Sequence, residues 1–217
     1  MIYITTYPLT QRINPMRKLL LTTAAVAAAI GLAGCGNSDP DTLTDKRDGQ
    51  KYRTVVIGGD RWMAQNINYK TKSGSWCYDN NTDNCKQYGK LYDWKTATTV
   101  CPKGWKLPSS ADWDRLVAAA DGEEIASGKK LKTKNGWEEN GNGTNDYGFS
   151  ALPSGRRNTD GMFYNVGYYG YWWTATEKCC GYASGRDMGY EYGHVTKYGD
   201  GDDKGYGRAV RCVADRP

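Results

Sequence analysis

The sequence predicts a single α+β domain, and two observations support this prediction. Helical patterns occur early, at 91–100 and 109–121, whereas short strand patterns dominate the later part of the chain. Glycine-rich loops separate these strands, and 27 of the 217 residues are glycine. Helices and short strands that are segregated in this way are typical of α+β folds.

The composition describes a polar, loop-rich domain. Most aromatic side chains are tyrosine (17) or tryptophan (8), and only 2 are phenylalanine. The mean hydropathy is -0.75. Such rings pack well while keeping a hydroxyl or N–H near water or a partner. Three of the 29 basic residues and none of the 24 acidic residues precede Cys35, so the net charge of +5 falls to +2 beyond it. This balance gives no concentrated basic face, and we expect no nucleic-acid partner.

Residues 1–35 read as an export signal. A basic start at 16–18 is followed by an apolar run at 19–32 and then by Leu-Ala-Gly before Cys35. The run is short of the ~20 residues that span a bilayer, and the pattern is typical of a secretory signal with its true start at Met16. A transmembrane segment and a plain signal peptide are the alternatives.

The end of this segment resembles a bacterial lipobox. The resemblance implies that Cys35 carries a diacylglycerol, that cleavage precedes it and that its new amine is acylated. Several acyl chains anchor a protein stably to a membrane. Gly36 stands where an aspartate would imply retention at the inner membrane. We therefore expect an outer-membrane lipoprotein that faces the periplasm or the cell surface.

The remaining chain divides into a tether and a domain. Residues 36–50 are polar, contain no aromatic residue and are expected to form a flexible tether. Residues 51–217 are expected to form the domain. It begins with a hairpin, in which strands at 52–57 and 61–64 flank a turn at 58–60.

The helix expected at 109–121 has a start signal and a buried face. Ser109 and Asp112 have the spacing of an N-terminal capping box. Trp113 and Leu116 begin an apolar stripe with helical spacing, and we expect them in the core, as we do Trp62 and Met63. Further strands are expected at 130–132, 149–156, 168–176 and 208–213.

Six cysteines remain beyond Cys35, and six allow 15 pairings. Closeness in sequence favours Cys77–Cys85, whereas a bond between Cys101 and Cys212 would close a long loop, stabilising by roughly 4–5 kcal/mol. Cross-pairing stays open. The neighbours Cys179 and Cys180 have three alternatives: a vicinal disulfide, free thiols or a bridge to another chain.

Calcium is the one candidate cofactor. Asp79, Asn81 and Asp83 begin a calcium-loop pattern, but Lys90 stands where a helix–loop–helix site needs glutamate. A looser calcium site and an ordinary turn are the two interpretations. A second acidic loop lies at 200–205. The single histidine, His194, excludes sites that need two.

Several blocks of the sequence resemble one known family, the Fibrobacter succinogenes major paralogous domain, over residues 52–215. The blocks are DRWMAQNINY, CYDNNTDNCKQYGKLYDW, CPKGWKLPSSADWDRL, NDYGFSALPSGRR, YWWTATE and AVRCV, at 60–69, 77–94, 101–116, 145–157, 171–177 and 209–213. The resemblance implies a C-type-lectin-like fold, in which two helices flank a twisted antiparallel sheet with long irregular loops. It also implies that the chain ends meet, with neighbouring terminal strands and a Cys101–Cys212 disulfide.

The known activities of other proteins with this fold cannot be assigned to this chain from its residues. The calcium-binding triplets of sugar-binding C-type lectins, such as Glu-Pro-Asn and Trp-Asn-Asp, are absent. Formylglycine-generating enzymes share the wider fold and need a redox cysteine pair, a role that we do not assign to Cys179 and Cys180. Fold by itself does not give function.

We therefore expect a non-catalytic, lipid-anchored surface protein that binds an extracellular polysaccharide or an envelope protein. Planar rings stack on sugar faces, and tyrosine offers contact area with few rotamers to restrict. The candidate contacts are the tyrosines of the late loops and strands, namely Tyr164, Tyr168, Tyr169, Tyr171, Tyr190, Tyr192, Tyr198 and Tyr206.

Two alternatives remain. One is a structural envelope component. The other is an enzyme, carbohydrate-active or similar to the formylglycine-generating enzymes, for which His194 and Glu177 would be candidates. No nucleophile motif such as G-x-S-x-G accompanies His194, and we do not expect an enzyme.

Overall fold

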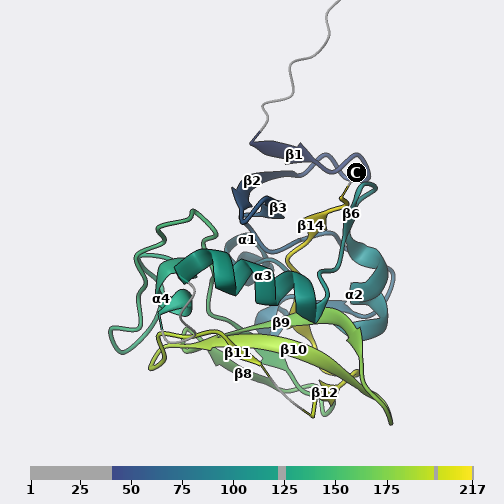
Figure 1. The fold of residues 1–217 in the computed structure, drawn as a ribbon. Coiled ribbons are helices and arrows are strands. Elements are labelled where there is room, and N and C mark those ends of the chain that lie inside the picture. The colour runs from purple at the N-terminus through teal and green to yellow at the C-terminus, as the bar shows by residue number, and fades with distance from the viewer. Residues whose placement is uncertain (1–40, 122–125, 198–199, 217) are drawn as a thin grey trace, which may run out of the picture. The chain divides into compact units, whose positions relative to one another are not determined.

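The computed structural model describes residues 41–121, 126–197 and 200–216, which Figure 1 draws in colour. The expected export signal, the lipidation site Cys35 and residues 36–40 lie outside the described residues.

One sheet joins the two ends of the described chain. Its order is β1-β2-β3-β14-β6, with every neighbouring pair antiparallel. The strands are β1 (Thr42–Thr44), β2 (Lys51–Ile57), β3 (Asp60–Met63), β14 (Val213–Ala214) and β6 (Trp105–Lys106). The expected hairpin is confirmed, with Gly58 and Gly59 at φ of 60° and 81°, the left-handed region that glycine adopts without steric cost. Val213 lies opposite Trp62, so the terminal strands are neighbours as expected.

The second sheet is built on the long pair β9 (Tyr169–Glu177) and β10 (Tyr182–Gly189). It continues through β13 (Arg208–Ala209), β5 (Leu91–Tyr92) and β4 (Ser75–Trp76) on one side and β11 (Thr196–Lys197) on the other. Additional strands are β12 (Asp202–Asp203), β7 (Ser154–Arg157) and β8 (Phe163–Val166). Most pairs are antiparallel, and β9 also pairs in parallel with β7 and β13.

The helices are short, and the longest, α3 (Ser110–Asp121), contacts both β2 and β9. Its expected capping box is confirmed, because the Ser109 N–H donates to Asp112 Oδ2 at 2.7 Å and the Asp112 N–H donates to Ser109 Oγ at 3.1 Å. The others are η1 (Tyr78–Asn80), α1 (Thr82–Tyr88), α2 (Trp94–Val100) and α4 (Ser127–Leu131). Among the described residues, no helix combines the length and the apolar character that crossing a membrane requires.

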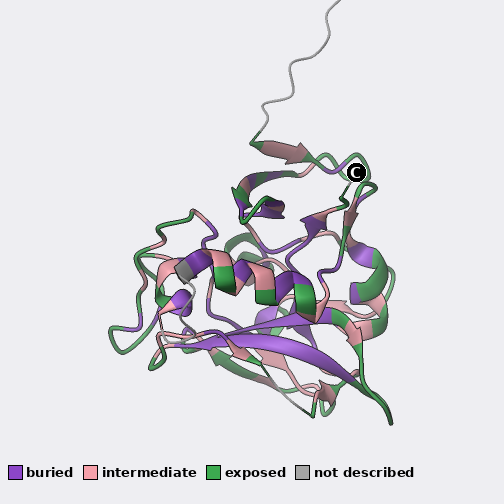
Figure 2. Cartoon of the chain, viewed as in Figure 1, coloured by how far each residue is buried: buried purple, intermediate pink, exposed green. Residues whose placement is uncertain are grey.

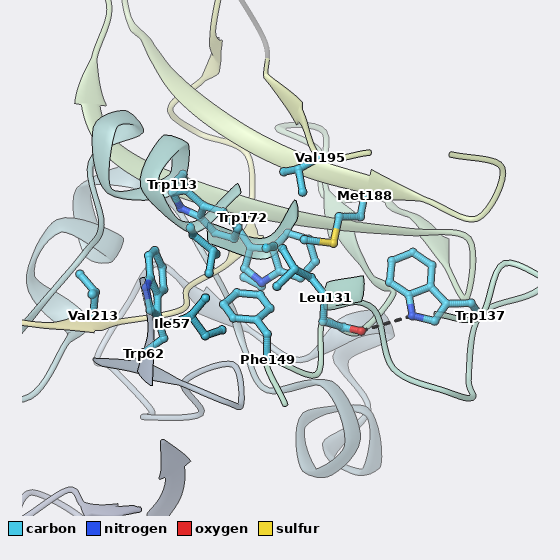
Figure 3. Close-up of a cluster of buried hydrophobic side chains, with 14 residues drawn as sticks. Ile57, Trp62, Trp113, Leu131, Trp137, Phe149, Trp172, Met188, Val195 and Val213 are labelled. Carbon is cyan, nitrogen blue, oxygen red and sulfur yellow. Dashed lines mark hydrogen bonds between the residues drawn. The ribbon is translucent and has the colours of Figure 1, made fainter. Parts of the chain in front are cut away.

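Tryptophans from distant parts of the chain meet in the core, as Figure 3 shows. The ring centroid of Trp113 on α3 lies 5.4 Å from that of Trp62 on β3, 5.8 Å from that of Phe149 and 5.9 Å from that of Trp172 on β9. Each of these side chains is fully buried. The expected core positions Trp62, Met63, Trp113 and Leu116 are all confirmed as buried.

Two disulfides staple the domain. Cys77 is bonded to Cys85 across η1 and α1, and Cys101 after α2 is bonded to Cys212 before β14. Both agree with the sequence expectation. Cys179 and Cys180 are exposed free thiols.

The prediction of a flexible tether at 36–50 is wrong for residues 42–50, which lie in the described part of the chain. Strand β1 pairs with β2, and the loop after β1 is fixed by Arg47, whose guanidinium pairs with Asp45 at 2.6 Å and donates to the Val100 carbonyl at 2.7 Å. Residues 42–50 therefore belong to the domain, because β2 would otherwise leave an edge of unpaired backbone groups.

Other differences have local causes. The helix expected at 91–100 is divided into β5 and α2, because Asp93 caps α2 by accepting from the Thr96 N–H at 2.8 Å. The strand expected at 130–132 is instead the end of α4, whose Leu131 is buried. The strand expected at 208–213 is interrupted between β13 and β14, where the chain crosses from one sheet to the other. The segment between Cys77 and Cys85, where a calcium site or an ordinary turn was expected, contains η1 and α1. Strands β8 and β10 were not expected from the sequence.

The fold is thus mixed α+β, with curled, mainly antiparallel sheets and few helices. Figure 2 shows β10 buried along nearly its whole length and α3 alternating between buried and exposed positions. Arg186 of β10 contacts α3 directly, donating to the Ser110 carbonyl at 3.1 Å and to Asp114 at 2.7 Å.

Candidate functional site

Four of the candidate tyrosines gather at one end of the β9–β10 pair. Tyr168 precedes β9 and Tyr190 follows β10, and the Tyr190 N–H donates to the Tyr168 carbonyl at 2.9 Å. Their rings meet edge to face at 5.4 Å, and Tyr169 meets Tyr190 in the same way at 6.0 Å. Tyr192 follows two residues on and is 41% exposed. We call Tyr168, Tyr169, Tyr190 and Tyr192 the tyrosine cluster.

A carboxylate is held within the cluster. Tyr169 Oη donates to Glu191 Oε1 at 2.6 Å. Hydrogen bonds from Tyr169, Tyr192 and Tyr190 hold the pKa of Glu191 below its usual value. The hydrogen bonds to this carboxylate raise the pKa of Tyr190 and of Tyr192, and repulsion between the carboxylate and an ionised phenolate adds to the effect. These shifts favour protonated Tyr190 and Tyr192 beside an ionised Glu191.

A pocket of about 220 Å³ opens beside the cluster. Its lining combines rings, amides, cations and the carboxylate, and is made of Lys129, Lys132, Asn140, Gly141, Asn142, Tyr190, Glu191, Tyr192 and Gly193. This arrangement places ring faces next to hydrogen-bond donors and acceptors of both kinds. Ligand sites usually combine apolar or aromatic faces with a few convergent polar groups, and this lining contains both kinds of group.

Lys132 fixes the loop that carries the cluster. Its ammonium donates to the carbonyls of Gly189 at 2.9 Å and Tyr192 at 3.0 Å, and it lies 4.9 Å from the centre of the Trp137 ring. Lys132 is 2% exposed, and burial lowers its pKa to about 8. Because three groups hold the ammonium in place, the loop at 189–192 has a defined position relative to α4.

The opposite wall of the pocket is shaped by close backbone packing. Asn140 adopts a left-handed φ of 61°, a conformation that asparagine tolerates better than most residues. A side chain at Gly141 would come within 2.5 Å of the Tyr190 backbone, so this position requires glycine. The backbone N–H of Trp137 donates to Asn142 Oδ1 at 3.0 Å. Residues 140–142 thus form one wall of the pocket.

The other candidate tyrosines lie elsewhere. Tyr164 is exposed on β8, opposite Arg156 on β7. Tyr206 is half-buried, with the Arg156 guanidinium 5.4 Å from its ring. Tyr171 is corrected: its ring stacks on Tyr169 with centroids 5.7 Å apart and its hydroxyl accepts from Asn165 Nδ2 at 2.9 Å. Because it is only 4% exposed, it supports the cluster from below and offers no face to a partner. Tyr198 lies outside the described residues.

The two residues considered for catalysis are far apart in the fold. His194 is half-buried and packs against Tyr192 at 4.9 Å. Glu177 ends β9 at the opposite end of the strand pair and forms an ion pair with Lys204 at 2.5 Å. They do not share a site.

The expected calcium loop uses its polar groups locally. Asn81 Oδ1 caps α1 by accepting from the Asp83 N–H at 2.9 Å, and Asp83 pairs with Lys86 at 2.7 Å. In the second acidic loop, Asp202 pairs with buried Arg208 at 2.5 Å. Within the part of the chain that the structure describes, no three His, Cys, Asp or Glu side chains gather as a metal site would need. Calcium gains no support from this geometry.

A larger hollow of about 710 Å³ lies between Thr71–Ser73 and α2. It is lined by threonine, serine, lysine and aspartate side chains and has no aromatic ring. The pocket at the tyrosine cluster is the better ligand site, since it joins apolar faces to fixed polar groups.

Sequence reasoning identified the tyrosines of this site but missed its polar wall. Asn140, Asn142, Lys129 and Glu191 carried no motif, and the one signal was the glycine–asparagine run from Asn140 to Asn145. Such a run reads as a loop, and only the packing of Gly141 on Tyr190 brings it to the cluster.

No curated protein and no solved structure matches the chain. A family model, the Fibrobacter succinogenes major domain, matches residues 55–214. This match includes both sheets from β3 to β14, both disulfides and the whole tyrosine cluster. The chain therefore belongs to the Fibrobacter succinogenes major domain family.

Proposed function

We propose that this chain is a non-catalytic binding module of a lipid-anchored envelope protein, and that its tyrosine cluster and pocket bind an extracellular polysaccharide. The observation that carries the proposal is a cluster of four tyrosines, two of which, Tyr190 and Tyr192, line one pocket together with amide, ammonium and carboxylate groups.

The chemistry of this lining suits a sugar. Ring faces stack on the C–H faces of pyranose rings, while sugar hydroxyls both donate and accept hydrogen bonds. Glu191 accepts hydrogen bonds, the exposed Lys129 donates them, and the Asn140 and Asn142 side chains offer both functions. The pocket of about 220 Å³ is smaller than the roughly 300–1,000 Å³ of sites for drug-sized ligands. It therefore suits one sugar residue of a longer chain, with neighbouring residues resting on the exposed rings.

The setting is also a proposal. We infer that Cys35 carries the lipid and that the protein faces the periplasm or the cell surface of the outer membrane, on the basis of the apolar run, the Leu-Ala-Gly sequence and Gly36. We further infer a variant of the C-type-lectin-like fold. The support is the adjacency of β3 and β14 and the Cys101–Cys212 bond, which together join the two ends of the domain.

The test is retention of a chain that lacks residues 1–36 on cellulose, xylan and mannan. Tyr168→Ala and Tyr192→Ala remove exposed rings of the cluster, and each should weaken binding by roughly tenfold, the equivalent of about 1.4 kcal/mol. The matched control is Tyr182→Ala, which removes a ring that is 44% exposed at the other end of β10 and should leave binding unchanged.

Two results would contradict the proposal. No retention of the parent chain on any of these polysaccharides would remove the polysaccharide as ligand. Equal losses for Tyr182→Ala and the two cluster variants would move the binding site away from the pocket. A partner protein of the envelope would then be sought by pull-down with the same variants.

A further inference from the structure

The turn between β9 and β10 carries two adjacent thiols. Cys179 and Cys180 are both exposed, and hydrogen bonding to Cys179 raises the pKa of the Cys180 thiol, so their sulfurs are close. The Lys178 N–H donates to the Tyr182 carbonyl at 3.0 Å, and the Tyr182 N–H donates to the Cys179 carbonyl at 3.1 Å. Figure 1 shows this turn at the end of the two longest strands, beyond β12. The backbone thus presents both thiols at a defined, protruding tip.

The rest of the chain indicates an oxidising environment. Cys77–Cys85 and Cys101–Cys212 are disulfides, and structural disulfides form and persist in oxidising compartments. An exposed thiol in such a compartment is open to exchange with any disulfide it meets. The same environment that forms the two staples therefore acts on Cys179 and Cys180.

These two cysteines are poorly placed to bond to each other. Consecutive Cα atoms are about 3.8 Å apart across a trans peptide, whereas disulfides usually need roughly 4.4–6.8 Å. The described residues contain no cis peptide bond, and their other four cysteines are already paired. Cys35, outside the described residues, is the one remaining cysteine of the chain. Sulfur partners for both thiols must therefore come from beyond the folded domain.

We propose that this tip is a covalent dimerisation site, at which Cys179 and Cys180 form disulfides with a second copy of the same chain. Two adjacent thiols on one copy are matched by the same two thiols on another across a twofold axis, so that Cys179 of each bonds to Cys180 of the other. Two-fold interfaces are self-complementary in this way. A partner with a single cysteine would leave one thiol unpaired.

The surroundings of the tip permit this contact. Exposed charges of both signs, Lys178 and Asp203, lie on neighbouring segments joined through Lys204, whose N–H donates to the Gly181 carbonyl at 3.1 Å. Two copies related by a twofold axis can therefore place opposite charges against each other.

The chemistry needs a disulfide as oxidant. One thiolate of the pair attacks a small-molecule disulfide, forms a mixed disulfide and releases one small thiol. A thiolate of the second copy then attacks the cysteine sulfur of this mixed disulfide, forms the interchain bond and releases the second small thiol. Each interchain bond thus oxidises two protein thiols, reduces one disulfide and frees two small thiols, in the ordinary course of thiol–disulfide exchange.

Dimerisation at the tip leaves the tyrosine cluster open. The cluster lies at the Tyr169–Gly189 end of the strand pair and the thiols lie beyond the Glu177–Tyr182 end. Eight residue steps of about 3.3 Å put roughly 25 Å between them. A dimer would present two pockets, and linking two sites increases the avidity for a repeating ligand. The proposal itself does not depend on what the pocket binds.

The test is the mass of the full chain after equilibration with oxidised and reduced glutathione. The parent should migrate at twice the monomer mass without reductant and at the monomer mass with it. Trypsin cleaves after Lys178 and Arg186, so the peptide Cys179–Arg186 should appear joined to its own copy. A mixture of unlabelled and nitrogen-15-labelled chains should give the hybrid peptide, which proves that the bond joins two molecules.

Matched variants identify the sulfurs. The double variant Cys179→Ser/Cys180→Ser should remain monomeric with an unchanged melting temperature, because both side chains are exposed and both structural disulfides remain. Cys35→Ser should still dimerise. A peptide found with an internal disulfide, bonded to Cys35 of its own chain or only as a glutathione adduct would overturn the proposal. So would a covalent dimer that persists in the double variant.

Discussion

The side-chain carbonyl of Asn66 accepts two hydrogen bonds from Arg211, from Nη2 at 2.9 Å and from Nε at 3.1 Å. Arg211 is fully buried and burial lowers its pKa to about 9. Within the described chain its guanidinium is held by amide oxygens, including the carbonyls of Phe149 and Ser150, and forms no ion pair with a carboxylate. Asn66 also accepts from Trp172 Nε1 at 2.9 Å. One amide thus joins the crossing segment before β14 to the centre of the other sheet.

Removing that amide should destabilise the domain strongly. In Asn66→Ala, Arg211 and Trp172 Nε1 lose their shared acceptor while staying buried, and each buried donor left without a partner costs about 1–3 kcal/mol, more where the donor is charged. Urea unfolding followed by tryptophan fluorescence measures the loss. Asn135→Ala is the control, because Asn135 is exposed and should change the free energy of unfolding by less than about 0.5 kcal/mol. Similar values for the two variants would show that Asn66 is not a junction.

The two disulfides should contribute unequally. Cys101–Cys212 joins residues 111 apart in sequence, whereas Cys77–Cys85 joins residues 8 apart. Under the chain-entropy model their loss costs about 5 and about 2.5 kcal/mol respectively, since the longer loop gains more freedom when unfolded. Thermal unfolding of Cys101→Ser and Cys77→Ser compares them directly. A Cys101→Ser chain that melts at the parent's temperature would contradict this ranking.

The features that were predicted correctly are those fixed by nearby residues. Ser109 and Asp112 are three residues apart, so the start of α3 is encoded locally. The turn at Gly58–Gly59 is likewise encoded by the two residues that adopt left-handed φ. Periodicity placed Trp113 in the core because one helix face must be covered.

The features that were missed depend on distant partners. Strand β10 contains Gly185, Arg186 and Asp187, which read as a loop, yet all three are buried. Arg186 is tolerated there because Asp114 on α3 pairs with it at 2.7 Å. In the same way, the pocket wall was invisible because its contact with Tyr190 joins segments about fifty residues apart. No local pattern encodes either arrangement.

Acid should weaken the junction between the chain ends. Asp60 accepts from Arg216 Nε at 2.9 Å and from Arg115 Nε at 3.0 Å, and these bonds hold its pKa below the usual value. A depressed folded pKa gives stability that is present above about pH 4, the unfolded value, and is lost as pH falls through the lower folded value. Asp60→Asn should therefore cost about 1–3 kcal/mol at pH 7 and should lessen the fall in unfolding free energy between pH 4 and pH 2. A parent and variant with parallel pH profiles would contradict this role.

Raising the pH above 8 should increase the free energy of unfolding through Lys132. Burial is the main cause that lowers its folded pKa to about 8, with a smaller effect from Lys129, against an ordinary value of 10.5. The cost of burying the charged ammonium is thus fully present below pH 8. It is relieved as pH rises toward 10.5, because the unfolded chain then binds the extra proton. The neutral amine keeps two N–H donors, matching its bonds to Gly189 and Tyr192.

The stability of the parent relative to Lys132→Met should therefore rise between pH 8 and pH 10.5 in urea unfolding. Lys129→Met, at the neighbouring pocket lysine, is the control and should keep this rise. A stability difference between parent and Lys132→Met that stays constant across this range would show that Lys132 is not buried as a charged group.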